Sequence, residues 1–207
     1  MASNDAIVEA AFRQAGMIRA RSTSELVSFA KALLLPPLRG DRLAVMSSSG
    51  GSAVIGADLC AAYGFVLPSL PEELIASVAQ HARAGIIKLS NPMDLGDISD
   101  LAVRLEAFDR VLALPSIDGL VINLHFSPTS STLGRMTHDD LLDGLAQLMQ
   151  KHRKPIAMSY ASQRGQIAPV HQTGILPLFW SIEESMQALA AARAWARTVH
   201  RRAIREM

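Results

Sequence analysis

Short apolar runs alternate with longer amphipathic segments over most of the chain. The runs with the length of buried strands are residues 43–46, 65–67, 119–124, 155–159 and 175–179, with a further extended piece expected at 86–89. The segments with helical spacing of apolar residues are 53–63, one that opens at 71–73, 100–114, 138–152 and 182–202. Strands separated by helices of about 10 to 15 residues form βαβ units. The pattern therefore predicts an α/β fold with a doubly wound, mostly parallel sheet.

The first 40 residues follow a different pattern, with two helical segments and no strand. One helix is expected up to Gly16, and a second runs from a cap at Ser24 to Leu35, before two consecutive prolines. We therefore divide the chain into an N-terminal helical extension with a linker, residues 1–40, and an α/β domain, residues 41–207.

Composition limits the partners that the chain is expected to have. Of its 207 residues 49% are apolar and 19% charged, and its formal net charge is +1. No clustered basic face is evident, so we expect neither a nucleic-acid nor a membrane partner. The apolar runs are too short to span a membrane, and no basic segment leads into an apolar one at the N-terminus. We expect a cytoplasmic protein.

The single cysteine and the scattered histidines give no metal site. Cys60 lies in an apolar helical stretch, where it is interpreted as a small core residue rather than a nucleophile. No disulfide can form within the chain, and no pair of histidines has the spacing of a zinc-binding helix.

A serine- and glycine-rich stretch joins the expected strand at 43–46 to the expected helix at 53–63. Glycine lets backbone N–H groups approach a ligand, serine adds hydroxyl groups, and a helix N-terminus presents N–H groups without intrahelical partners. Two interpretations stay open: a cradle for phosphate or carboxylate, and a tight turn that needs glycine for its backbone angles. The candidate phosphate-binding residues in this stretch are Ser48, Ser49, Gly50, Gly51 and Ser52.

This Ser/Gly loop matches neither of two common phosphate-binding motifs. No Lys-Ser or Lys-Thr pair follows the glycines, as in a P-loop, and the G-x-G-x-x-G fingerprint is absent. We expect the loop at the carboxyl end of the first sheet strand, with the N–H groups of Gly51 to Val54 free of intrahelical partners.

A second polar loop spans Ser90–Gly96 and contains two further candidate residues, Asn91 and Asp94. Their side chains either shape a turn by bonding to nearby backbone, or line a site together with the Ser/Gly loop. Ligands of parallel sheets bind beyond the carboxyl ends of the strands. We therefore expect this loop to lie beside the Ser/Gly loop and place both residues among the candidate phosphate-binding residues.

A serine hydrolase is a weaker interpretation of the same residues. The serines at 47–49 can be combined with His125, which ends a buried strand, and with Asp94. No G-x-S-x-G elbow supports this arrangement, and a structural role is favoured for His125. We assign no catalytic residue.

Five stretches, taken in order, resemble one enzyme family. They are residues 5–19, whose pattern continues at residues 24–26, then residues 40–51, the Asn-Pro-Met-Asp-Leu sequence at 91–95, residues 118–121 and residues 153–156. They are similar to nucleoside-diphosphate-forming acyl-CoA synthetases, which are relatives of succinyl-CoA synthetase. These enzymes convert an acyl-CoA, a nucleoside diphosphate and phosphate into the acid, CoA and a nucleoside triphosphate, or the reverse, through a phosphohistidine.

The resemblance implies a role for the fold and for the Ser/Gly loop. The chain would be the second of two flavodoxin-like domains, and the helix after the loop would point its N-terminus at the phosphohistidine. The whole enzyme would use CoA, ATP or GTP, and Mg, none of them held by this chain alone. Its partners would be the CoA-binding, phosphohistidine and ATP-grasp domains or subunits, with phosphate as ligand, and we expect a homo-oligomer.

Two departures from the family pattern affect this expectation. The Ser-His-Thr-Gly motif of the catalytic histidine is absent, so none of the six histidines inherits that role. The family loop usually reads Gly-Gly-Pro-Gly, where this chain has Gly50-Gly51-Ser52-Ala53. We expect a fragment or excised domain of such a ligase. The alternative is a non-catalytic binding or regulatory module of the same fold.

Overall fold

The computed structural model describes residues 4–82, 89–98, 100–125 and 137–205. Its centre is a parallel sheet of five strands in the order β2-β1-β3-β4-β5. This order is that of flavodoxin, so the expected doubly wound α/β fold is confirmed. The strands are β1 (Leu43–Ser47), β2 (Met93–Asp94), β3 (Gly119–His125), β4 (Ile156–Ala161) and β5 (Leu178–Phe179).

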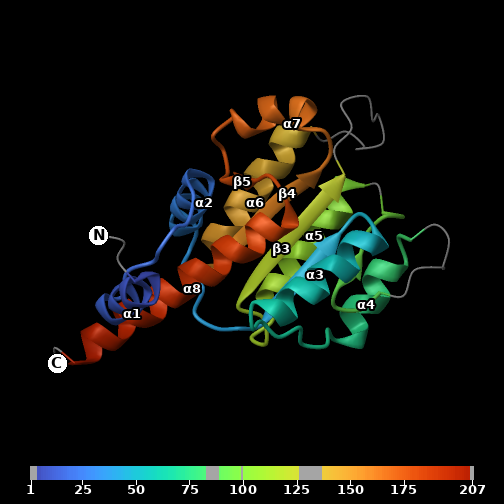
Figure 1. The fold of residues 1–207 in the computed structure, drawn as a ribbon. Coiled ribbons are helices and arrows are strands. Elements are labelled where there is room, and N and C mark those ends of the chain that lie inside the picture. The colour runs from blue at the N-terminus through green and yellow to red at the C-terminus, as the bar shows by residue number, and fades with distance from the viewer. Residues whose placement is uncertain (1–3, 83–88, 99, 126–136, 206–207) are drawn as a thin grey trace.

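Helices cover both faces of the sheet (Figure 1). Helices α3 (Gly50–Ala62) and α8 (Ile182–Arg205) lie on one face, and α5 (Leu101–Ala113) and α6 (His138–His152) lie on the other. The remaining helices are α1 (Asp5–Ala15), α2 (Thr23–Leu33), α4 (Glu72–Ala79) and α7 (Arg164–His171). Within the described residues, no helix is long and apolar enough to cross a membrane.

Of the two N-terminal helices, α2 packs against the C-terminal helix. Helix α2 lies along α8, where Ser28 Oγ donates to Glu184 Oε1 (2.5 Å) and Gln187 Nε2 donates to Glu25 Oε1 (2.9 Å). The cap of α2 is Ser22 rather than the expected Ser24, because the Ser22 hydroxyl accepts the Glu25 N–H. The division at residue 40 stays a prediction.

The edge of the sheet differs from the expectation. The strand expected at 65–67 is wrong, since only Val66 pairs, in a single bridge to Arg42. The edge strand is instead β2, inside the loop at 91–96 that we expected to be a turn. The Asn91 side chain supplies the reason: it accepts the Val45 N–H (3.0 Å) and donates to Leu43 O (2.9 Å), so it takes the place of a strand backbone beside β1.

Two further segments bear on the sequence predictions. Helix α7 was not expected, because Pro169 lies inside it and proline usually ends a helical pattern. Most of the extended piece expected at 86–89 lies outside the described residues.

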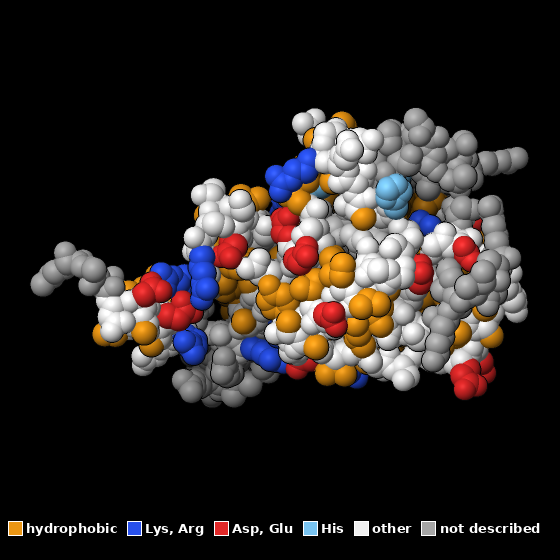
Figure 2. Space-filling view, turned by 45° about the vertical axis from the view of Figure 1, so that its right-hand side comes forward, with side chains coloured by type: hydrophobic (Ala, Val, Ile, Leu, Met, Phe, Trp, Pro, Cys, Tyr) orange, Lys and Arg blue, Asp and Glu red, His pale blue; other side chains and the backbone are white. Residues whose placement is uncertain are grey.

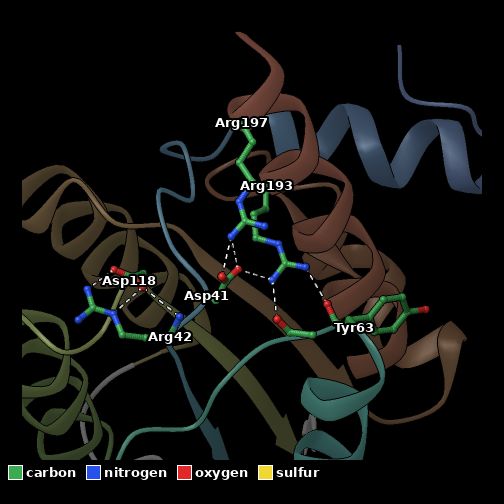
Figure 3. Close-up of polar contacts among 7 residues, drawn as sticks. Asp41, Arg42, Tyr63, Asp118, Arg193 and Arg197 are labelled. Atoms are coloured by element: carbon green, nitrogen blue, oxygen red, sulfur yellow. Dashed lines mark hydrogen bonds and ion pairs between the residues drawn. The ribbon is translucent and has the colours of Figure 1, made fainter. Parts of the chain in front are cut away.

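Helix α3 approaches β1 closely because Gly56 has no side chain. A Cβ atom at Gly56 would stand 2.7 Å from Val45 Cγ1 and 3.1 Å from Ile182 Cδ1. The other end of α3 is fixed by Arg193, whose guanidinium donates to Tyr63 O (2.7 Å), Gly64 O (2.9 Å) and Asp41 (2.6 Å; Figure 3). These contacts set where α3 begins relative to the sheet.

Two partly buried histidines make the stability of the fold depend on pH. His171 stacks on Trp180 with ring centroids 3.9 Å apart, and its buried Nε2 has no hydrogen-bond partner in the described part of the chain. Burial first, and then the charge of Lys31, lowers the pKa of His171 below its ordinary value of 6.5. Burial also lowers the pKa of His138.

A histidine with a lowered pKa destabilises the fold in acid, because the unfolded chain binds the proton first as the pH falls. We expect the urea midpoint to decrease from pH 7.5 to pH 5.5, a window in which ordinary carboxylates stay ionised. His171→Gln should reduce this decrease and His138 should account for the remainder. An unchanged pH dependence in His171→Gln would contradict the assignment.

Candidate phosphate-binding site at the carboxyl edge of the sheet

The Ser/Gly loop leaves the sheet between β1 and β3, where the direction of strand order reverses. Ligands of open α/β sheets bind at such a switch point. The Ser48 N–H donates to Asn123 O (3.1 Å), and the Ser48 hydroxyl accepts the His125 N–H (2.6 Å). The Ser47 hydroxyl, which is fully buried, accepts the Ser49 N–H (3.2 Å). Hydrogen bonds to β3 and within the loop thus hold its backbone in place.

Helix α3 begins at Gly50, three residues earlier than the sequence pattern predicts. Ser49 is the cap: its hydroxyl accepts the Ser52 N–H (3.4 Å) and its carbonyl accepts the Ala53 N–H (3.0 Å). The expectation that the N–H groups from Gly51 to Val54 are free is therefore wrong for Ser52 and Ala53. Within the described residues, the N–H groups of Gly50 and Gly51 have no acceptor. These two groups form the open positive end of α3.

The second loop lies against the first, as expected. The Leu95 N–H donates to Ser47 O (2.6 Å), and a Cβ atom at Gly96 would stand 3.1 Å from Ser48 O. Asp94 is the residue that faces α3. Its Oδ1 accepts the Gly96 N–H (2.8 Å), and its Oδ2 lies 3.1 Å from the point where a Cβ atom of Gly50 would stand. A carboxylate thus borders the two open N–H groups.

Asn91 lies further back along β1 than the other candidate residues. Its side-chain amide contacts the backbone of Leu43, Val45 and Pro68. The structure therefore brings Ser48, Ser49, Gly50, Gly51, Ser52 and Asp94 together, and places Asn91 at the sheet edge instead.

A row of four polar residues lies under the loops, and sequence reasoning missed two of them, Asn123 and Ser159. Asp94, Ser47, Asn123 and Ser159 are register partners on four neighbouring strands, so their side chains project from the same face. Asn123 Nδ2 donates to Ser159 Oγ (2.9 Å), and both residues are buried. In the sequence, the signal for these residues is a polar residue at the carboxyl end of an otherwise apolar strand.

The contacts of the serines argue against a hydrolase. The Ser48 hydroxyl is bonded to the backbone of His125, and the Ser49 hydroxyl caps α3. No histidine ring bonds to either hydroxyl in the described part of the chain. Cys60 is buried, which raises the pKa of its thiol to about 12, so it remains a neutral thiol.

The arrangement suits an anion that brings its own hydrogen-bond donor. Two backbone N–H groups at a helix N-terminus bind an anion, and the carboxylate of Asp94 beside them accepts an N–H or O–H. Among the described residues, no Lys or Arg side chain bonds to the Ser/Gly loop, and no group of three His, Cys, Asp or Glu side chains could hold a metal. The site is therefore built from backbone and hydroxyl groups and one acid.

Comparison with known proteins finds relatives that match parts of this sequence. No family model matches the chain. It is 39% identical over 110 residues, 53% of its length, to the ADP-forming acetate–CoA ligase I of Archaeoglobus fulgidus. It is 25% identical over 192 residues, 91% of its length, to the ADP-forming 4-hydroxybutyrate–CoA ligase of Nitrosopumilus maritimus. The chain is homologous to part of the ADP-forming acid–CoA ligases.

The similarity to these ligases covers a minor part of each of them. The chain spans 15% of the A. fulgidus ligase and 26% of the N. maritimus ligase. Its fold matches a solved acetyl-coenzyme A synthetase of Ca. Korarchaeum cryptofilum with a TM-score of 0.77 and 23% sequence identity. That match covers 95% of this chain and 43% of the solved chain.

Proposed function

We propose that this chain is the domain of an ADP-forming acid–CoA ligase that docks a phosphohistidine at the N-terminus of α3. The observation that carries the proposal is the pair of open N–H groups at Gly50 and Gly51, beside the Asp94 carboxylate. The homology to ADP-forming ligases supports the assignment to such an enzyme.

Each part of the site has a task in this proposal. The phosphoryl oxygens accept hydrogen bonds from Gly50 and Gly51 and lie in the positive field of α3. When the phosphorylated imidazole is protonated on its second ring nitrogen, the Asp94 carboxylate accepts that N–H, which fixes the orientation of the ring. A partner domain or subunit supplies the histidine.

The Ser52-Ala53 departure from the Gly-Gly-Pro-Gly pattern leaves this site intact. Both residues lie inside the first turn of α3, and their N–H groups already bond to Ser49. A glycine at either position would add no open donor. This geometry supports the docking function over a module that has lost phosphate binding.

An exposed apolar face continues from the site along α3. Val54 is 62% exposed and Ile55 is 47% exposed, and Figure 2 shows hydrophobic side chains gathered on the face that carries α3 and α8. Further exposed apolar residues on the opening helices include Ile7, Leu26 and Leu34. Exposed apolar side chains beside the Ser/Gly loop and on the opening helices are typical of a domain that works against partner domains.

Asp94→Asn tests whether the site is built for a phosphorylated imidazole or for any anion. Asparagine keeps the acceptor for Gly96 and removes a negative charge a few ångströms from the anion. We expect inorganic phosphate to bind about fivefold more tightly, since two charges about 4 Å apart in water repel by about 1 kcal/mol. Phosphoimidazole should gain less, because it loses the acceptor for its ring N–H.

Affinities from isothermal titration or amide shifts decide this test. The control is Asp97→Asn, which removes a charge just after this loop, at a residue without a contact to α3 among the described residues. Equal gains for phosphate and phosphoimidazole in Asp94→Asn would contradict the role of the carboxylate as an imidazole acceptor.

A further inference from the structure

The turn at residues 94–98, which begins with Asp94, is held by a buried arginine on the neighbouring helix α5. Arg104 lies in the first turn of α5 and is 7% exposed. Its Nε donates to Ile98 O (2.6 Å) and its Nη2 donates to Leu95 O (3.2 Å). No carboxylate of the described residues forms an ion pair with it. The side-chain hydrogen bonds of Arg104 go to carbonyl groups of this turn.

Hydrogen bonds hold the turn from two sides, and Asp94 is its first residue. The Leu95 N–H is bonded to Ser47 at the end of β1, whereas the Leu95 carbonyl is bonded to Arg104 on α5. The Gly96 N–H then points back to Asp94 Oδ1. The distance of Asp94 from α3 is thus fixed by β1 on one side and by Arg104 on the other.

We propose that Arg104 is a positioning residue that sets the place of the Asp94 carboxylate beside the open N–H groups of α3. The hydrogen bonds of the turn carry the positioning role of Arg104. The effect of that role on phosphate binding rests on the proposed docking function. A planar guanidinium bonds two carbonyl groups at once with fixed spacing, which the point charge of a lysine does not reproduce. Both Arg104→Lys and Arg104→Met should therefore release the turn, although lysine keeps the charge.

The first readout is independent of any ligand. The Gly96 amide, which Asp94 protects, should exchange its hydrogen at least about tenfold faster in both Arg104 variants, because the turn opens locally. Arg110→Met is the matched control: Arg110 lies on the same helix but bonds to Ser77 on α4, away from the turn. Its Gly96 exchange should equal that of the unaltered protein. Unchanged Gly96 exchange in Arg104→Lys would overturn the proposal.

The second readout is the coupling between Arg104 and Asp94 in phosphate binding. The gain of about fivefold that Asp94→Asn gives should fall below about twofold in the Arg104→Lys background, because residues of one hydrogen-bonded unit are not additive. A full gain in that background would overturn the positioning role, as would an Arg104→Lys protein that binds like the unaltered one.

The two proposals fail in different ways. If no protein of the series binds phosphate or phosphoimidazole at the loop, while Gly96 exchange is accelerated in Arg104→Lys, the docking function fails and the hold of Arg104 on the turn stands. If Arg104→Met does not fold, Arg104→Lys gives both readouts, since it retains the buried cation and most of the side-chain volume.

Discussion

Gly56→Leu should destabilise the protein by about 1 kcal/mol and move α3 away from the sheet. Overpacking a close contact costs about 1–3 kcal/mol, against which leucine regains about 1 kcal/mol in helix propensity. The neighbouring side chains have little room to move away from the added leucine, because Val45 is buried and branched and Ile182 lies on the other side. Urea unfolding gives the loss, and the amide shifts of Gly50 and Gly51 report the displacement.

Gly165→Leu is the matched control for this prediction. Gly165 also lies in a helix, but a Cβ atom there would meet nothing within 4 Å. The substitution should leave stability unchanged or raise it slightly, because leucine is the better helix former. Equal losses at Gly165 and Gly56 would contradict the close packing of α3 on β1.

Arg193→Met should cost about 2–3 kcal/mol, because hydrogen bonds to a charged group contribute about 1.5–3 kcal/mol and two backbone carbonyls lose their donor. Arg193 is largely buried, with 12% of its side chain exposed, and its guanidinium lies 4.0 Å from the ring centroid of Phe65. It also complements the negative C-terminal end of α3. The loss should appear in thermal and urea unfolding alike.

Arg197→Met measures how much an ion pair with Asp41 contributes to stability without the hydrogen bonds to the carbonyls at the end of α3. Arg197 binds the same acid, Asp41, but is 51% exposed. Exposed ion pairs contribute about 0–1 kcal/mol, so its replacement should cost less than about 1 kcal/mol. A loss as large as that of Arg193→Met would show that the pair with Asp41, rather than the carbonyls of Tyr63 and Gly64, holds α3.

The central strands were predictable because burial on both faces makes them continuous apolar runs. Strand β3 and strand β4 fall where the runs at 119–124 and 155–159 place them. Strand β2 has two residues, one of them Asp94, and carries no such signal. Its place depends on Asn91 reaching back to β1, which is a long-range contact that no local pattern contains.

The place of the candidate site was more predictable than its hydrogen bonds. The Ser/Gly loop follows an apolar run, so the rule for parallel sheets puts it at the carboxyl edge. Which N–H groups stay open depends on the residue that caps α3, and Ser49 rather than a later residue does so. The positions of Asp94 and Arg104 depend on how three elements pack, and periodicity alone does not contain that information.

The most direct test of the docking site follows backbone amides while phosphoimidazole is added. We expect the largest shifts at Gly50 and Gly51. Gly50→Pro removes one donor at the first position of α3, where proline fits and where Ser49 before it is already extended. It should weaken binding about tenfold, the loss expected for one hydrogen bond to a charged group. Gly50→Ala adds the same Cβ beside Asp94, keeps the N–H and should bind more tightly than Gly50→Pro. Largest shifts elsewhere, or equal affinities for the proline and alanine variants, would contradict a phosphoryl site at the start of α3.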